Sequence, residues 1–264
     1  MNIKKEDNQY FGQYIEEAVN AYINKTPIVN NTGHSFSFEE IDEMNQDAFL
    51  IASFLKGTTS QYTGRKTTTT NGDLVVDNQV IELKYVSQGA GTYLNTSIEY
   101  FHSRLGFSSF KDYTKKELLP FLAQYFGTSV YDNLSPVSQS MSKEIRHNQP
   151  NLYKEIQKID KKMRKEYVED LYSFLCLNPD KLQLFVSDML SKNIGTKQLP
   201  DKIIVFNYLD KTIRLIDNVT ILSFIQNKQF KKNPLGLVFD NFRVAIGWQN
   251  GNGLNNPTIR VFIK

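Results

Sequence analysis

The run DLVVDNQVIELKYV at residues 73–86 constrains the fold of this chain more than any other stretch. Two segments rich in β-branched residues flank Asp77 and Asn78, and a two-residue connection of this kind is typical of a tight β-hairpin turn. With these two residues as the turn, Asp73 in the first strand lies directly opposite Glu82 in the second. The sequence therefore predicts a hairpin in which two carboxylates face each other.

Side chains along the second strand alternate between an apolar face and a charged face. The apolar face carries Ile81, Leu83 and Tyr85. Glu82 and Lys84 lie on the other face, and Asp73 joins them, because directly opposed residues have Cβ atoms about 4.5–5.5 Å apart. We therefore expect the apolar face to enter a core and the opposite face to present two carboxylates and one ammonium group.

Two carboxylates opposed on a sheet repel each other, and the ammonium group of Lys84 balances only part of their charge. A hard divalent cation would balance the rest, and Mg²⁺ binds one or two carboxylates, several waters and a phosphate. It lowers the pKa of a bound water and neutralises charge on a phosphodiester in the transition state. Lys84 could orient that water. These parts predict phosphodiester hydrolysis with Mg²⁺ as the cofactor.

The rest of the composition excludes several other kinds of site. Cys176 is the single cysteine, which excludes an intramolecular disulfide and a cysteine-based zinc cluster. The three histidines, His34, His102 and His147, are too far apart for an HExxH metal helix. No nucleophile elbow, Walker A loop or dinucleotide fingerprint occurs, so we expect no organic cofactor. Without a membrane span or signal peptide, we expect a cytoplasmic protein with no membrane partner.

The net charge of +3 is unevenly distributed along the chain. Residues 1–56 contain four lysines and nine acidic residues, so the remainder of the chain is basic. The stretch 143–165 alone contains eight basic residues and three acidic ones. A basic body favours a polyanionic partner, although a solvated helix face explains the stretch 143–165 equally well.

Strands and helices interleave along the sequence. Apolar spacing and capping residues predict helices at 9–24, from Ser37 to Gly57, and near 95–105, 115–126, 151–176 and 180–193. Further strands are expected at 202–208, 212–217, 242–248 and 258–264, a loop or edge strand at 57–72, and a short helix at 219–227. This mixture indicates an α/β (α+β) fold with a mixed central sheet flanked by helices, in one domain over 1–264.

At the hairpin the sequence resembles the PD-(D/E)xK nuclease superfamily. The motif is Gly72 and Asp73, eight intervening residues, then Glu82, Leu83 and Lys84 inside an apolar strand. The resemblance implies that Asp73 and Glu82 bind Mg²⁺, that Leu83 also contributes to the metal site, and that Lys84 helps to activate the attacking water. Gly72 stands where the family often has proline.

The same family often carries an acidic residue on an N-terminal helix, within a Gly-x-x-x-Glu pattern. Gly12 and Glu16 fit this pattern, which implies a catalytic role for Glu16, with Glu17 as its competitor. An exposed helical glutamate without a role in the site is the alternative reading of either residue.

The resemblance is greatest to type II restriction endonucleases, which implies sequence-specific cleavage of double-stranded DNA by a homodimer. It implies a restriction-endonuclease-like core at about 9–105 plus 200–217, a helical insertion at about 110–195 and a β-rich DNA-recognition part at about 218–264. Three alternatives remain open. They are a repair or junction-resolving nuclease of the same superfamily, a non-catalytic DNA-binding protein, and an ordinary surface hairpin whose Glu–Lys pair contributes less than about 1 kcal/mol.

Two groups of residues are candidates for DNA binding. Arg65 and Lys66, on a Thr-rich loop, suit phosphate contacts, and Gln88 follows the motif strand closely. The residues suited to reading base edges are Arg243, Gln249, Asn250, Asn252 and Arg260. They lie on two predicted strands and on the loop 249–256 between them, which we interpret as the recognition loop. An ordinary flexible hairpin loop is the alternative interpretation.

Overall fold

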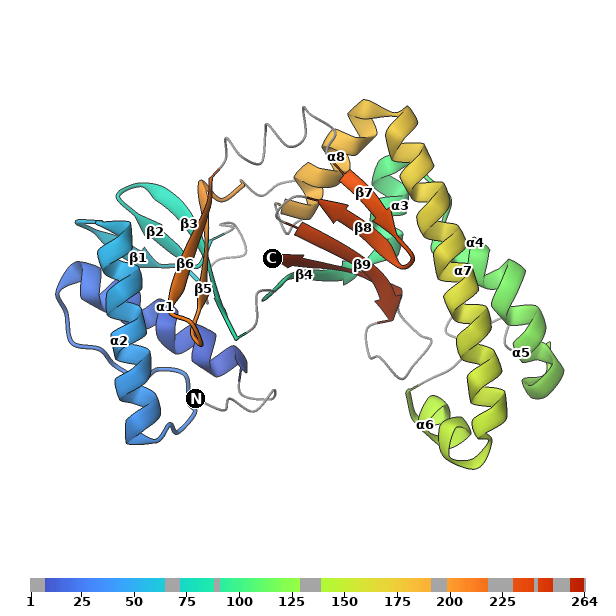
Figure 1. The fold of residues 1–264 in the computed structure, drawn as a ribbon, viewed down its shortest axis with the longest axis horizontal. Helices are drawn as coiled ribbons and strands as arrows, with labels where there is room; N and C mark the ends of the chain where they lie inside the picture. The colour runs from blue at the N-terminus through green and yellow to red at the C-terminus, as the bar shows by residue number, and fades with distance from the viewer. Residues whose placement is uncertain are drawn as a thin grey trace. The chain divides into compact units, whose positions relative to one another are not determined.

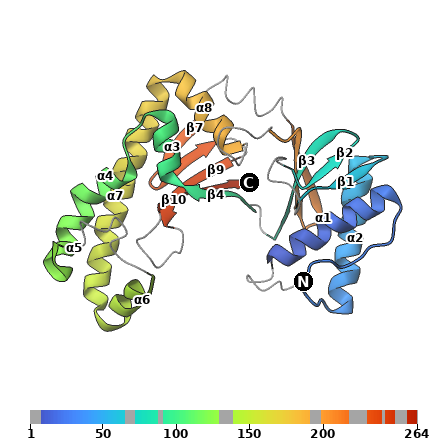
Figure 2. The ribbon, with the colours of Figure 1, turned by 180° about the vertical axis from the view of Figure 1, so that it is seen from behind.

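The computed structural model describes residues 8–64, 72–87, 91–128, 139–190, 199–217, 230–239, 242–248 and 257–263 of the 264-residue chain. The chain divides into two compact units, shown from opposite sides in Figures 1 and 2. The first unit consists of Met1–Gly91, Leu190–Ser223 and Ile263–Lys264, and the second of Thr92–Met189 and Phe224–Phe262. Each unit contains most of one five-stranded sheet.

The first unit is built on a mixed sheet with the strand order β1-β2-β3-β5-β6. Its strands are β1 (Ser60–Tyr62), β2 (Leu74–Val76), β3 (Gln79–Val86), β5 (Lys202–Asn207) and β6 (Thr212–Asp217). β3 runs antiparallel to β2 and parallel to β5, and β5 runs antiparallel to β6. The predicted mixed sheet is therefore confirmed, and β1 forms the edge strand that was one of two expectations for residues 57–72.

The hairpin of β2 and β3 has the register expected from the sequence. Leu74 pairs with Ile81. Asp77 and Asn78 have φ values of 46° and 66°, and a two-residue turn of this type requires positive φ at both positions. The Asp77 carboxylate accepts hydrogen bonds from the backbone N–H groups of Thr58 and Thr59, which lower its pKa to about 2. The turn is therefore tied to the segment that leads into β1.

The low pKa of Asp77 predicts a contribution to stability that depends on pH. Folding lowers the pKa of Asp77 from 3.8 to about 2. Its contribution to stability is therefore complete at pH values above the pKa of the unfolded state, and it is lost as the pH falls through the pKa of the folded state. We expect the variant Asp77→Asn to unfold at lower urea concentration than wild type at neutral pH. The difference should shrink as the pH falls from about 4 to about 2. Urea unfolding at several pH values measures this, and a difference that is independent of pH would contradict the prediction.

Two helices cover one face of the first sheet. They are α1 (Asn8–Asn24) and α2 (Phe38–Leu55), which lie beside the sheet in Figure 1. The Ser37 side chain caps α2 by accepting from the Glu40 N–H, and the Glu40 carboxylate accepts from the Ser37 N–H in return. Apolar residues of both helices form one buried cluster with Ile81 and Leu83. The face of β3 that carries Glu82 and Lys84 is thereby directed away from these helices.

The second unit has the strand order β4-β10-β9-β8-β7. Its strands are β4 (Gly91–Ser97), β7 (Phe230–Asn233), β8 (Gly236–Phe239), β9 (Phe242–Trp248) and β10 (Pro257–Ile263). Its helices are α3 (Ile98–Leu105), α4 (Phe110–Tyr113), a π-helical turn (Thr114–Leu118), α5 (Leu119–Phe126), α6 (Gln139–Asn148), α7 (Pro150–Leu177) and α8 (Pro179–Leu190). The long helix α7 packs against β7, β8 and β9. No helix among the described residues is both long enough and apolar enough to cross a lipid bilayer.

One boundary of the predicted core differs from the structure. Residues 91–97 form a strand, so the helix expected near 95–105 begins only at Ile98. Because this strand, β4, pairs with β10, residues 92–105 belong to the second unit and the N-terminal part of the first unit ends at Gly91. The second unit therefore contains β4, α3, most of the expected helical insertion and most of the C-terminal strands. The short helix expected at 219–227 lies outside the described residues.

Candidate metal and catalytic site

The structure brings the three motif residues together on the face of β3 that points away from α1 and α2. The Lys84 ammonium group forms an ion pair with Glu82 Oε1 and lies 4.0 Å from Asp73 Oδ2. The Glu82 side chain is only 1% exposed, and those of Lys84 and Asp73 are 18% and 15% exposed. The two carboxylates and the ammonium group therefore form a partly enclosed charged cluster rather than a solvated surface pair.

Asp73 reaches this cluster through an irregularity at the end of the hairpin ladder. We expected Asp73 to pair directly with Glu82, but the regular register ends at Leu74 and Ile81. The Asp73 N–H donates to the Ile81 carbonyl at 2.8 Å, and the Asp73 carboxylate accepts from the Leu83 N–H, also at 2.8 Å. The Asp73 carboxylate thus takes the place of a main-chain carbonyl as the acceptor for the Leu83 N–H of β3. This corrects the expected pairing and explains how the carboxylate is held beside Lys84.

The main chain of Leu83 also faces this site. Its side chain is buried in the core cluster with α1 and α2. Its N–H points to Asp73, and the N–H and C=O of one strand residue point to the same side of the strand. Any contribution of Leu83 to a metal site would therefore come from its main-chain oxygen.

The oxygen donors around Asp73 fit a magnesium ion. The set comprises the carboxylates of Asp73 and Glu82 and the carbonyl of Leu83, and hard oxygen donors of this kind suit Mg²⁺. Within the described residues, no three side chains of the types His, Cys, Asp and Glu group together as a metal site. Mg²⁺ does not require such a group, because it usually completes its octahedral shell with water and phosphate oxygens.

The structure separates the two candidate glutamates of α1. Glu17 accepts hydrogen bonds from the side chains of Gln13 and Asn31, so it binds the loop that follows the helix. Glu16 lies beside Gly64 instead. Its Oε2 atom would be only 3.0 Å from a Cβ atom placed on that glycine. Gly64 follows directly on Thr63, whose N–H donates to the main-chain oxygen of Asp73. Glu16 is therefore the glutamate on the side of Asp73, and its catalytic role stays a prediction.

The candidate DNA-binding residues are only partly described. Arg65, Lys66, Gln88, Gln249, Asn250 and Asn252 lie outside the described residues and stay predictions. Arg243 on β9 and Arg260 on β10 alternate with buried apolar residues, so both belong to the face of the second sheet opposite its core. The guanidinium group of Arg243 is exposed and lies 4.8 Å from the centre of the Phe262 ring. The strands expected on both sides of the loop 249–256 are confirmed.

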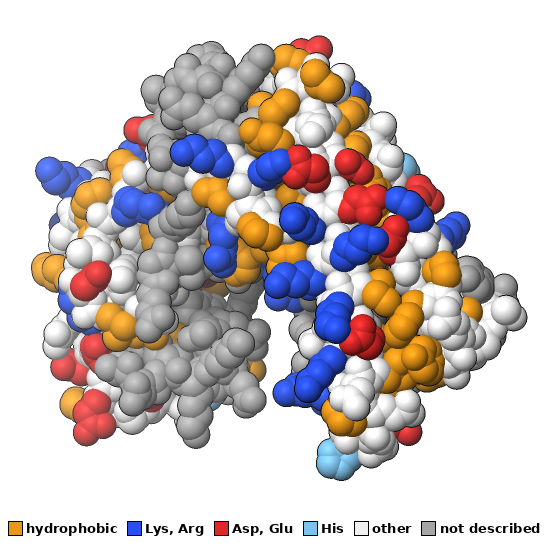
Figure 3. All heavy atoms as spheres, turned by 45° about the vertical axis from the view of Figure 1, so that its right-hand side comes forward, with side chains coloured by type: hydrophobic (Ala, Val, Ile, Leu, Met, Phe, Trp, Pro, Cys, Tyr) orange, Lys and Arg blue, Asp and Glu red, His pale blue; other side chains and the backbone are white. Residues whose placement is uncertain are grey.

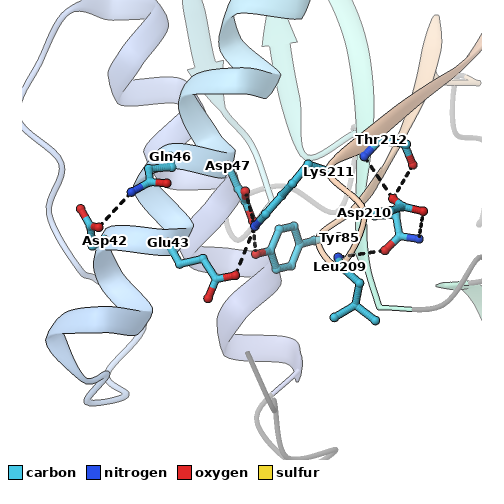
Figure 4. A network of polar contacts seen from close by, with 10 residues as sticks. Asp42, Glu43, Gln46, Asp47, Tyr85, Leu209, Asp210, Lys211 and Thr212 are labelled. Carbon is cyan, nitrogen blue, oxygen red and sulfur yellow. Dashed lines mark hydrogen bonds and ion pairs between the residues drawn. The ribbon is translucent and has the colours of Figure 1, made fainter.

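A polar network centred on the buried Asp47 was not predicted from the sequence. Figure 4 shows Tyr85 and Lys211 converging on Asp47 of α2. The Tyr85 hydroxyl donates to Asp47 Oδ2 at 2.7 Å, and Lys211 Nζ donates to both Asp47 oxygens at 2.8 and 2.9 Å. Burial and the neighbouring Asp47 carboxylate raise the pKa of Tyr85, so it remains a neutral donor. Because Tyr85 follows Lys84, the network fixes β3 directly beside the charged cluster.

The only sequence signal for this network was the alternation along β3, which places Tyr85 opposite the charged face. Asp47, which accepts from Tyr85, belongs to helix α2, and Lys211 lies in the turn between β5 and β6. These two residues are 164 positions apart in the sequence. No local spacing could have revealed that they meet.

Comparisons with known proteins give a weak structural likeness. No protein-family model matches the chain, and no curated protein sequence matches it. The chain is similar to the restriction endonuclease MspI, whose crystal structure was determined in complex with its cognate DNA. The likeness covers 98% of this chain and 93% of that chain, with 11% sequence identity and a TM-score of 0.39. At this TM-score the likeness supports no inference about the site, so its residues and their geometry carry the functional interpretation.

Proposed function

We propose that this chain is a Mg²⁺-dependent endonuclease that hydrolyses phosphodiester bonds of double-stranded DNA. The cluster of Asp73, Glu82 and Lys84 carries the proposal. A carboxylate that is 1% exposed, beside a second carboxylate and an ammonium group, is costly unless the charges balance one another or bind a cation. Buried charge of this kind, with oxygen donors suited to Mg²⁺, is favoured at a site that stabilises charge during a reaction.

Each residue has a distinct part in the proposed reaction. The carboxylates of Asp73 and Glu82 and the carbonyl of Leu83 would hold the metal ion. The bound metal supplies a water of lowered pKa and neutralises negative charge on the phosphate. Lys84 donates hydrogen bonds to the attacking oxygen and stabilises the negative charge that develops on it. Its low exposure strengthens this effect, because electrostatic interactions weaken in bulk water.

The finer assignment is a type II restriction enzyme that acts as a homodimer in the cytoplasm. Reading of a short sequence would involve Arg243 and Arg260, together with Gln249, Asn250 and Asn252 of the loop 249–256. Their support is the position of both arginines on one face of the second sheet, next to that loop in the chain. A dimer would bring one catalytic cluster to each DNA strand.

Plasmid cleavage tests the proposal and separates it from its rivals. We expect discrete fragments from plasmid DNA in the presence of Mg²⁺ and no cleavage in the presence of a chelator. Cleavage confined to branched DNA would instead favour a junction-resolving nuclease of the same superfamily. Binding of duplex DNA without cleavage, whichever divalent metal is supplied, would overturn the proposal in favour of a non-catalytic DNA-binding protein.

Replacing the candidate base-reading arginines should reduce sequence discrimination. For Arg243→Ala and Arg260→Ala we expect a loss of about 1–3 kcal/mol of preference for cognate over non-cognate DNA per lost base contact. Arg65→Ala and Lys66→Ala, assigned to phosphate contacts, should weaken binding to all sequences and reduce its dependence on salt. Titration of cognate and non-cognate duplexes with each variant measures both effects. If the two pairs of variants behave alike on both duplexes, this division of roles is wrong.

A further inference from the structure

Four lysines form a row along one face of helix α7. Lys154, Lys158, Lys161 and Lys165 follow one another at intervals of four, three and four residues, which places them on a single helix face. All four are exposed. At a rise of about 1.5 Å per residue, this basic row is about 16 Å long. Figure 3 shows Lys and Arg side chains gathered over this part of the second unit.

Among the described residues, several other cations of the second unit are held in ion pairs, whereas three of the four lysines of the basic row are not. Lys116, Lys162, Arg164 and Lys232 all form ion pairs with acidic side chains. Within the described residues, Lys154, Lys161 and Lys165 form no ion pair, and only Lys158 has an acidic partner, Glu155. Like charges three or four residues apart destabilise a helix. The repulsion within the basic row therefore opposes helix stability, and all four of its side chains are exposed.

The N-terminal end of the row lies at an open hollow. The hollow has a volume of about 590 Å³, and its polar lining residues include Lys154, Lys158, Asn148, Gln149 and Asn151, together with Glu155, the ion-pair partner of Lys158. Ammonium and amide groups are both donors to phosphate oxygens. At this end of the row Lys154 and the amide residues offer donors to an anion, while Glu155 neutralises Lys158.

We propose that the basic row of α7 binds the phosphate backbone of double-stranded DNA without regard to sequence. This inference rests on the proposed function, which supplies the DNA partner, and it adds contact residues other than the catalytic cluster, Arg243 and Arg260. A row of this length spans several phosphates, because duplex DNA carries one charge per about 1.7 Å of its axis. Neutralisation by those phosphates removes the repulsion between the lysines.

A triple variant with a matched control tests this inference. Lys154, Lys161 and Lys165 are replaced together by alanine, and in the control the ion-paired Lys116, Lys162 and Lys232 are replaced by alanine. Both variants lose the same formal charge. Affinity for a duplex of random sequence is measured with Ca²⁺ at several salt concentrations. The slope of log affinity against log salt should become less steep by about 0.9 for each lost phosphate contact, and so by up to about 2.7 in the triple variant.

The control variant should keep the wild-type slope of log affinity against log salt. A variant with arginine in place of Lys154, Lys161 and Lys165 should also keep that slope, because arginine retains the positive charge. The melting temperature of the triple alanine variant should equal or exceed that of wild type, because alanine favours the helix and the repulsion is gone. If wild type cleaves DNA but the triple alanine variant keeps its slope, the inference about the row is wrong and the proposed function stands. If wild type neither binds nor cleaves duplex DNA, both are wrong.

Discussion

Replacing Asp73 or Glu82 by alanine should reduce Mg²⁺-dependent DNA cleavage by about a thousandfold or more. Each substitution removes a carboxylate that would hold the metal, and metal stabilisation of transition-state charge is worth several kcal/mol, with each 1.36 kcal/mol about tenfold in rate. Single-turnover cleavage measures the loss. Either variant with near wild-type cleavage would show that the metal is not bound here.

Asparagine at position 73 separates a catalytic role of Asp73 from a structural one. The Asp73 carboxylate accepts a hydrogen bond from the Leu83 N–H, which the side-chain oxygen of asparagine can still accept. We therefore expect Asp73→Asn to melt close to wild type and to be as inactive as Asp73→Ala. Asp42→Ala, which removes an exposed carboxylate on α2, serves as the control and should cleave normally.

Lys84→Ala should cleave at least about a hundredfold more slowly than wild type while still binding its DNA site in Ca²⁺. A group that acts in the transition state lowers the rate when removed and leaves ground-state binding intact, and one such charge stabiliser is typically worth about 10²–10³ in rate. Lys84→Arg should not rescue the rate fully, because a guanidinium group is larger and planar where a compact ammonium group is needed. A wild-type single-turnover rate in Lys84→Ala would mean that the motif is coincidental.

The geometry adds a second readout for Lys84. A surface pair would contribute less than about 1 kcal/mol to stability, but the Glu82 side chain is buried and paired with this ammonium group. Loss of Lys84 leaves a buried charge without its cation. We expect Lys84→Ala to melt below wild type in metal-free buffer and to recover when Mg²⁺ is added. A melting temperature that does not respond to Mg²⁺ would show that no metal binds beside Glu82.

The parts of the fold that follow a local period were predictable. The register of the hairpin at 73–86 follows from a two-residue turn and from alternation along β3, and the structure reproduces it as far as Leu74 and Ile81. Helix α2 begins directly after Ser37, as its capping pattern required. In these segments every residue that decides the structure lies within a few positions of the others.

The parts that depend on distant partners were not predictable. Residues 91–97 are a strand because β10, more than 150 positions further on, pairs with them, and no local window contains that partner. The expected pairing of Asp73 with Glu82 failed for a related reason. The main chain of Asp73 is also bonded to Thr63, so a third segment decides where the ladder ends. The site residues were identifiable because they share one strand and its neighbour, whereas Asp47 and Lys211 were not.

The parallel pairing of β3 with β5 has a consequence for the order of events during synthesis. Val80 exchanges hydrogen bonds with Asp201, 121 positions later, and most of the second unit is encoded between them. Until the ribosome has passed Asn207, β3 has no neighbour on its β5 side and its backbone groups there remain unpaired. Pairing across such a long loop is slow. The charged cluster can therefore become rigid only after β5 has been synthesised, so the proposed cleavage activity would be absent from a nascent chain before that point.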